Sequence, residues 1–198
     1  TGVGIDALMS DCEEIVSRCI AGLSQLEPSR GGEMDGLRPP FRRLEVRTAY
    51  REFAGWDPFE TEDPNRFDRD MVSKIEPSLD RSAGVFLVGY PRYQASIARL
   101  REKDDRTAER FELYLGGIEL ANGFDELTDA TEQRHRFMDE RSARIAKGMN
   151  DYPLDEKFLL GLESGMPGSS GIALGVDRLV MVLSGERRLE EVMLFPAG

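Results

Sequence analysis

The stretch ERFELYLGGIELANGFDE, which spans residues 109–126, predicts a β-hairpin with acids on one face. The Gly-Gly pair at its centre is a two-residue turn signal between two segments of alternating apolar and polar residues. Pairing outward from this turn places Tyr114 opposite Glu119, and Glu112 opposite Ala121. Glu112 and Glu119 then become diagonal neighbours on the polar face, roughly 5.5–8 Å apart at the backbone.

Two carboxylates this close repel each other unless a cation lies between them or they share a proton. Oxygen ligands suit Mg²⁺, which takes one or two carboxylates and completes its shell with waters and nucleotide phosphates. The segment 122–126, which follows the second acid, adds an amide, an aromatic ring and two more acids. The residues alone leave two interpretations open: a site for a cationic ligand, or a solvated polar face.

A second informative stretch is GIALGVDRLVM, residues 171–181, which predicts an apolar strand, a glycine and a helix. A helix N-terminus offers unpaired N–H groups and a partial positive charge to an anion. Arg178 in the first turn adds a guanidinium suited to a phosphate. The alternative is that Arg178 pairs with Asp177 or Glu163, as in many strand–helix units.

The rest of the sequence predicts helices and strands in alternation. Residues 27–40 are rich in proline and glycine, which is typical of a loop. A helix over residues 5–23 is predicted to bury one stripe, made of Leu8, Cys12, Ile15, Cys19 and Leu23. A helix capped by Thr48 is predicted to run through Tyr50 and Phe53. The remaining predicted helices are 64–76, 130–147, 154–162 and 176–183, and the remaining strands are 41–47, 85–88, 171–174 and 192–195. Without a Rossmann glycine fingerprint, these elements favour an α/β or α+β class with a largely antiparallel sheet.

Composition excludes several functions. The 198 residues carry a formal net charge of −11, which argues against a general binder of nucleic-acid backbone. No apolar run reaches the roughly 18–20 residues of a membrane helix. His135 is the only histidine and lies in a charged stretch, so we expect a solvated helix residue. Cys12 and Cys19 lie about 10 Å apart along one helix, too far for a disulfide, and we interpret them as core residues of a cytoplasmic protein.

Together the two informative stretches resemble class II aminoacyl-tRNA synthetases, in particular the lysyl-tRNA synthetase branch. The segment ELANGFDELTDA, residues 119–130, resembles the carboxylate-bearing strand of that family. Residues 171–178 resemble its motif 3. The similarity covers residues 84–196 well and the first 80 residues loosely. It implies the class II fold, a mainly antiparallel sheet flanked by helices.

Within this branch, the sequence is most similar to a short paralogue that joins (R)-β-lysine to a lysine of elongation factor P. The segment YPRYQASIA, residues 90–98, resembles the Gln-Ala-Ser segment of the paralogue, where lysyl-tRNA synthetases usually have Ser-Pro-Leu. Leu120 and Ala121 stand where synthetases tend to have Ile-Gly. Ala173 stands where synthetases carry glycine, and one methyl group in a pocket is worth about 1–3 kcal/mol of discrimination.

The resemblance implies a two-step ligase reaction. An amino acid carboxylate attacks the α-phosphate of ATP, and a nucleophile then takes the acyl group from the adenylate. The family pattern assigns Mg²⁺ to Glu112 and Glu119, and assigns ATP to the same two acids together with Arg178 and Gly175. Arg178 is the catalytic residue of this pattern, since it would bind the γ-phosphate. The residues implied for the lysine-like substrate are Asn122, Phe124, Glu126 and Ala173.

The sequence departs from the family at its N-terminal side. Motifs 1 and 2, which carry the dimer helix and the arginine for the α-phosphate, are not recognisable, so residues 1–198 resemble the C-terminal part of the catalytic domain. The full-length parent would be a possible homodimer. Two alternatives stay open: a fragment of a lysyl-tRNA synthetase, whose acceptor is tRNA, and a non-catalytic binding or regulatory module on the same scaffold.

Overall fold

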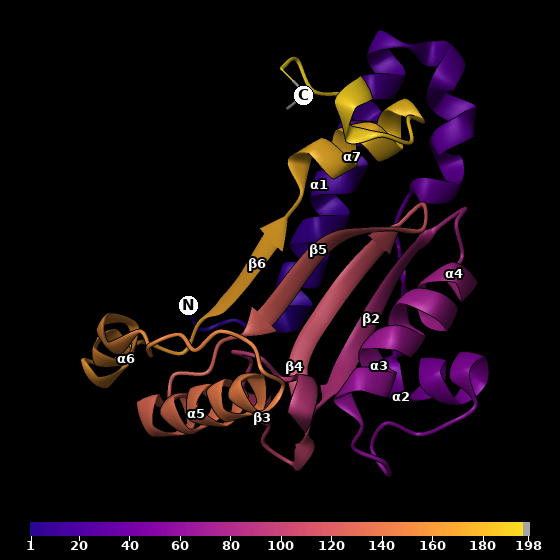
Figure 1. The fold of residues 1–198 in the computed structure, drawn as a ribbon. Helices are drawn as coiled ribbons and strands as arrows, with labels where there is room; N and C mark the ends of the chain where they lie inside the picture. The colour runs from indigo at the N-terminus through magenta and orange to yellow at the C-terminus, as the bar shows by residue number, and fades with distance from the viewer. Residues whose placement is uncertain (196–198) are drawn as a thin grey trace.

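The computed structural model describes residues 1–195, apart from the side chains of residues 30–33. Its centre is one mixed sheet in the order β1-β2-β4-β5-β6, with β3 paired to β4 (Figure 1). β1 runs parallel to β2 and the other pairs are antiparallel, so the sheet is largely antiparallel, as the sequence predicts. The strands are β1 Arg42–Glu45, β2 Gly84–Pro91, β3 Leu100–Arg101, β4 Asp104–Leu115, β5 Ile118–Asp125 and β6 Ser170–Leu174.

Helices cover the sheet unevenly (Figure 1). The long ones are α1 Ile5–Leu26, α5 Ala130–Ala146, α6 Glu156–Glu163 and α7 Val176–Ser184. Two composite helices combine α2 Val46–Ala49 with η2 Tyr50–Ala54, and α3 Pro64–Asp70 with η3 Met71–Ile75 and α4 Glu76–Ser78. Short 3₁₀ segments are η1 Pro28–Leu37, η4 Arg92–Gln94 and η5 Leu189–Glu191. Within the described residues, no helix combines the length and apolar character needed to cross a lipid bilayer.

Two predicted segments differ from the structure. Residues 27–40 are not simply a loop, because η1 occupies most of this stretch, with proline at its start, where the missing N–H is tolerated. Residues 192–195 form no strand; they follow η5 without regular structure. A short apolar run does not by itself distinguish a strand from an irregular segment.

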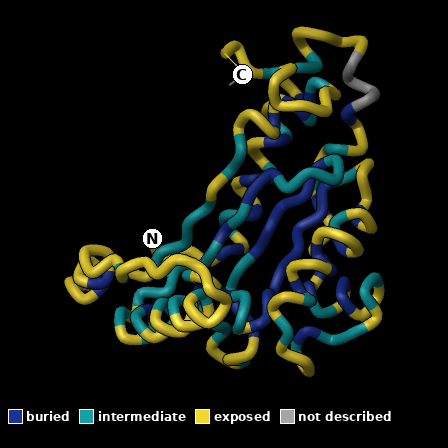
Figure 2. Tube along the Cα trace, in the orientation of Figure 1, coloured by how far each residue is buried: buried dark blue, intermediate teal, exposed yellow. Residues whose placement is uncertain are grey.

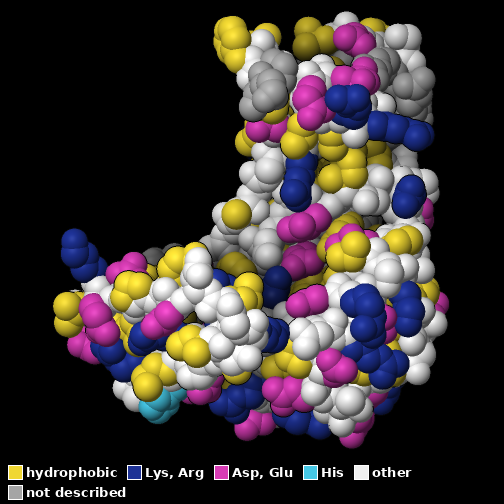
Figure 3. Space-filling model, in the orientation of Figure 1, with side chains coloured by type: hydrophobic (Ala, Val, Ile, Leu, Met, Phe, Trp, Pro, Cys, Tyr) yellow, Lys and Arg dark blue, Asp and Glu magenta, His cyan; other side chains and the backbone are white. Residues whose placement is uncertain are grey.

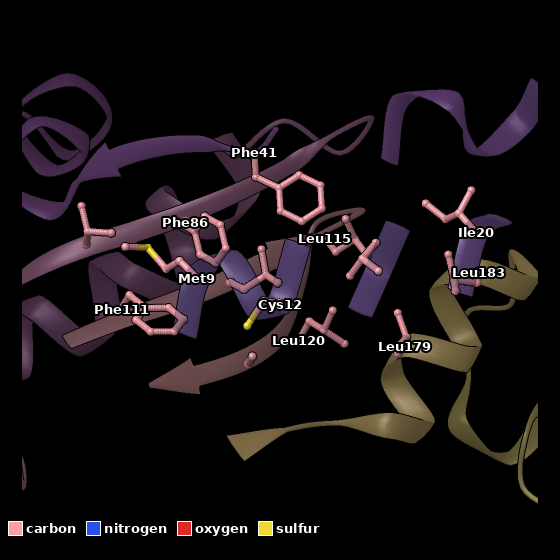
Figure 4. Packing of buried hydrophobic residues seen from close by; sticks show 14 of the residues in the cluster. Met9, Cys12, Ile20, Phe41, Phe86, Phe111, Leu115, Leu120, Leu179 and Leu183 are labelled. Carbon is pink, nitrogen blue, oxygen red and sulfur yellow. The ribbon is translucent and has the colours of Figure 1, made fainter. Parts of the chain in front are cut away.

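One face of the sheet packs against α1, and Figure 4 shows side chains of this core. The buried stripe of α1 is Ile5, Met9, Cys12, Val16 and Ile20. The predicted stripe is therefore wrong at Ile15, which is 43% exposed, and at Cys19, which is exposed as well. Cys12 is buried, and Leu8 and Leu23 are partly buried against the same core. Both stripes recur at helical spacing and share Cys12, so periodicity alone could not choose between them. Both cysteines are free thiols.

The opposite face is covered by helices over β1, β2 and parts of β4. There, α2 and α3 supply an aromatic cluster in which Tyr50 stacks on Phe67, with ring centroids 4.5 Å apart. The Tyr50 hydroxyl donates a hydrogen bond to the Phe67 carbonyl at 2.8 Å. Toward β6 the exposure rises, as the colours of Figure 2 show. This face of β5 and β6 is therefore open.

The predicted hairpin forms, but with one extra residue. Tyr114 lies opposite Glu119 as predicted, whereas Glu112 lies opposite Asn122 and not Ala121. The extra residue is Leu120. Leu120 and Ala121 are both buried in the core against α1, and the register shifts by one between them and Glu119. Such an extra residue in one strand of a pair is a β-bulge. Strict alternation would have placed Asn122 on the opposite face from Glu119; the bulge places both on the open face.

Gly123 lies at a tightly packed position of this hairpin. It lies opposite Phe111, and a Cβ atom at position 123 would lie less than 3.0 Å from two atoms of the Phe111 ring. Gly123→Ala is expected to destabilise the protein by about 1–3 kcal/mol through overpacking. Thermal unfolding should show a melting temperature lower by roughly 2–4 °C per kcal/mol.

The matched control is Gly22→Ala, at an exposed position of α1 with no neighbouring atom within 4 Å of the new methyl group. This change should be neutral or stabilise by up to about 1 kcal/mol, because alanine favours the helix. Equal melting temperatures for Gly123→Ala and the unsubstituted protein would contradict the packing argument.

Candidate functional site

The open face of β4, β5 and β6 carries most of the residues that the sequence singled out. Asn122 is the centre of this surface, since it pairs with Glu112 on one side and with Ala173 on the other. Phe124 pairs with Gly171 one step further along. Acidic and basic side chains follow one another over β4 and β5 (Figure 3).

Glu112 is a buried carboxylate with a full set of partners. Its side chain is 10% exposed, and Oε1 accepts a hydrogen bond from Arg110 Nη2 at 2.6 Å. The Tyr114 hydroxyl donates to Oε2 at 3.0 Å, and the Asn122 amide nitrogen lies 3.5 Å from Oε1. Because a lone buried charge is strongly unfavourable, the contacts with Arg110 and Tyr114 are what stabilise the Glu112 side chain in this buried position.

Arg110 is a site residue that the sequence interpretation missed. Its guanidinium lies over the Tyr90 ring at 4.3 Å and near the Phe124 ring at 5.6 Å. Its Nη1 donates to the Gln94 carbonyl at 2.7 Å. Alternation along β4 could have found it, because a residue two positions before Glu112 shares its face.

Glu76 is a second residue that sequence reasoning missed. Its Oε1 lies 3.2 Å from the Tyr114 hydroxyl, which also contacts Glu112. Burial raises the pKa of Glu76, and the charges of Glu112 and Glu119 raise it further. Burial, together with the nearby charges of Glu112 and Glu76, also raises the pKa of Tyr114. No pattern in the sequence connects α4 with the hairpin; only the packing of the helix on the sheet does.

Glu119 and Arg178 meet at the other end of the surface. Arg178 Nη1 donates to the Glu119 carbonyl at 2.7 Å and lies 3.5 Å from the carboxylate Oε2. The side chain of Glu119 is 39% exposed and that of Arg178 is 46% exposed, so both stay accessible to a ligand. Arg178 thus pairs with Glu119, and not with Asp177 or Glu163 as the alternative interpretation supposed.

α7 is anchored next to the bulge. Gly175 caps the N-terminus of this helix, and its N–H donates to the Leu120 carbonyl at 2.8 Å. The first turn of α7, with its unpaired N–H groups, therefore starts beside β5, and Arg178 reaches back over Glu119.

Glu126 and Asn122 offer unused acceptors. The Oδ1 atom of Asn122 is buried and has no hydrogen-bond partner within the described residues. The carboxylate of Glu126 is half-buried, and burial together with Asp125 raises its pKa. Buried polar atoms are nearly always hydrogen-bonded in folded proteins, so an orphaned acceptor beside open carboxylates indicates a ligand with donor groups.

The carboxylates of this face can bind Mg²⁺ only together with a ligand that supplies further oxygen atoms. Among the side chains that the structure describes, no three of Cys, His, Asp or Glu lie close enough to hold a metal ion. Glu119 is the accessible carboxylate and Glu112 the buried one. A carboxylate pair supplemented by waters and phosphate oxygens is the usual Mg²⁺ environment, so these residues are compatible with a metal that arrives with a nucleotide.

Comparison with known proteins agrees with this geometry. Residues 4–198 match the family model described as tRNA synthetases class II (D, K and N). Among curated relatives, an elongation factor P–(R)-β-lysine ligase of Proteus mirabilis is 50% identical over 126 residues, covering 64% of this chain and 39% of the relative.

Similarly named proteins match longer segments. The one from Edwardsiella ictaluri is 45% identical over 155 residues, covering 75% of this chain and 48% of the relative. The one from Avibacterium paragallinarum is 38% identical over 176 residues, covering 79% and 55%. The chain spans about half the length of the curated relatives it matches. Since the family model covers nearly all 198 residues, the chain belongs to the class II tRNA synthetase family (D, K and N).

Proposed function

We propose that this chain forms part of the catalytic site of a ligase that uses ATP to join a lysine-like amino acid to a lysine of elongation factor P. The observation that carries the proposal is one open face that holds two acids, an amide and a guanidinium, because the bulge at Leu120 turns Asn122 to the face of Glu112 and Glu119. The names of the curated relatives support this acceptor over tRNA. We expect the reaction to occur in the cytoplasm.

On this proposal, the nucleotide lies toward α7. Glu119 and Glu112 hold Mg²⁺, which neutralises phosphate charge when it is bound. Arg178 binds the γ-phosphate, because its guanidinium is half exposed and is already oriented by the Glu119 carbonyl. Gly175, which has no side chain, lets the adenine approach the start of the helix.

The amino acid lies toward Glu126 at the other end of the same face. Asn122 uses its unpaired Oδ1 to accept a hydrogen bond from the substrate, and Phe124 provides an apolar wall backed by Arg110. Glu126 pairs with an ammonium group, and Ala173, exposed beside Asn122, limits the space for the substrate.

The chemistry then follows two balanced steps. The substrate carboxylate forms a bond to the α-phosphorus of ATP, and pyrophosphate leaves. The amine of the acceptor lysine next attacks the acyl carbon, AMP leaves, and the amide forms with loss of a proton. Residues of this chain contribute charge neutralisation and orientation, which is the usual protein contribution to phosphoryl-type transition states.

We also propose that residues 1–198 are the C-terminal part of the catalytic domain. The arginine that holds the α-phosphate in this family belongs to motif 2, which is not recognisable in the sequence. Activation of an amino acid would then need that arginine from outside this chain.

Glu119→Ala tests the nucleotide site. Removing the accessible carboxylate should weaken binding of ATP–Mg²⁺ by roughly 10–100-fold, the size expected for one interaction with a charged group. Isothermal titration calorimetry of the full-length protein measures it. The matched control is Glu140→Ala, an exposed acid on α5, which should leave the affinity unchanged.

If neither the unsubstituted protein nor Glu119→Ala binds ATP–Mg²⁺, the chain is a non-catalytic module on the synthetase scaffold, and the proposed function is wrong.

Ala173→Gly tests the amino acid pocket. Removing the methyl group beside Asn122 should shift preference from β-lysine toward α-lysine by roughly 10-fold or more, since one methyl group in a pocket is worth about 1–3 kcal/mol. The measurement is the ratio of kcat/KM for the two amino acids in ATP–pyrophosphate exchange by the full-length protein. An unchanged ratio would refute the role of Ala173.

A further inference from the structure

The backbone of Glu126 is held from two sides. Its N–H donates to the Ser169 carbonyl at 2.9 Å, and the residue forms an isolated bridge with Ala98. The next N–H, of Leu127, donates to the Ile97 carbonyl at 2.8 Å. With its backbone fixed in this way, Glu126 can respond to a change in its surroundings only through its side chain.

The carboxylate of Glu126 lies over Gly171. A Cβ atom at position 171 would lie less than 3.0 Å from Glu126 Oε1 and 3.6 Å from Cδ. Gly171 is in β6, opposite Phe124, so its missing side chain would project onto the open face. Within the described residues, no side chain forms a hydrogen bond or an ion pair with this carboxylate. The carboxylate can lie here because Gly171 has no side chain to occupy the same space.

We propose that Gly171 is a positioning residue: its lack of a side chain lets the Glu126 carboxylate lie over β6, where it meets the side-chain ammonium of a diamino acid. The inference rests on the function proposed above and adds a determinant of substrate class. A side chain at position 171 displaces the carboxylate and removes the preference for a substrate that carries a second amine.

The fold tolerates this change better than the site does. The atom that a new methyl group meets is the far end of a flexible side chain, and not backbone. Gly171→Ala therefore moves the carboxylate while leaving the β5–β6 pairing in place. The variant therefore tests the position of the Glu126 carboxylate without a large change in the stability of the fold.

The first experiment compares L-lysine with norleucine, which lacks the side-chain amine, as ligands of the full-length protein. The unsubstituted protein is expected to bind lysine at least ~10-fold more tightly, the size of one hydrogen-bonded charge pair. Gly171→Ala should abolish this preference while leaving the norleucine affinity unchanged. Gly168→Ala is the control, because no atom lies within 4 Å of the new methyl group.

A double-mutant cycle with Glu126→Gln shows whether Gly171 acts through Glu126. If it does, the double variant has no weaker lysine binding than Glu126→Gln alone, because the two changes remove one interaction. Additive losses would overturn the inference, since they would assign Gly171 an independent effect.

A second readout does not depend on the proposed function. Carbon-13 labelling of glutamate carboxyl groups allows NMR titration of Glu126, assigned by its absence in Glu126→Gln. Burial raises the pKa of this group, so Gly171→Ala should lower the titration midpoint as the carboxylate moves into water. An unchanged midpoint overturns the positioning role. Equal affinities of the unsubstituted protein for lysine and norleucine instead overturn the proposed substrate.

Discussion

The open face of this molecule depends on one irregularity, the bulge at Leu120. Leu120 and Ala121 are consecutive in sequence, yet both are buried in the core against α1. Without the extra residue, strict alternation would turn Asn122 toward that core, where burying an unpaired amide costs about 1–3 kcal/mol. The same bulge offers the Leu120 carbonyl to Gly175, which fixes where α7 begins. A single irregularity therefore orients β5 and places the arginine-bearing helix.

The charged side chains on this face lie at two depths. Glu112 lies at the bottom, paired with Arg110 and Tyr114, so its negative charge is largely compensated within the protein. Glu119 and Arg178 lie nearer the surface, and solvent weakens their mutual attraction. A ligand therefore meets the accessible acid Glu119 and the accessible guanidinium of Arg178 first, and the buried acid Glu112 lies below them.

Local signals in the sequence predicted much of this architecture. The Gly-Gly turn, the strand–glycine–helix unit ending in Arg178 and the capped helix after Asp129 all form, because each is specified by residues adjacent in the chain. The buried stripe of α1 and the role of Glu76 were not predictable in this way. Both depend on which surface a helix presents to the sheet, and residues distant in sequence decide that.

The sequence contains a sign of the bulge that can be recognised once the structure is known. The acids Glu112 and Glu119 share a face across the turn, but Asn122, Phe124 and Glu126 have the opposite parity from Glu119 along one strand. Side chains alternate with a period of two, so residues of mixed parity can serve one ligand only if an extra residue intervenes. A change of parity between the residues of one motif is therefore a physical prediction of a bulge between them, and here it would have placed the irregularity within residues 120–121, where the structure has it.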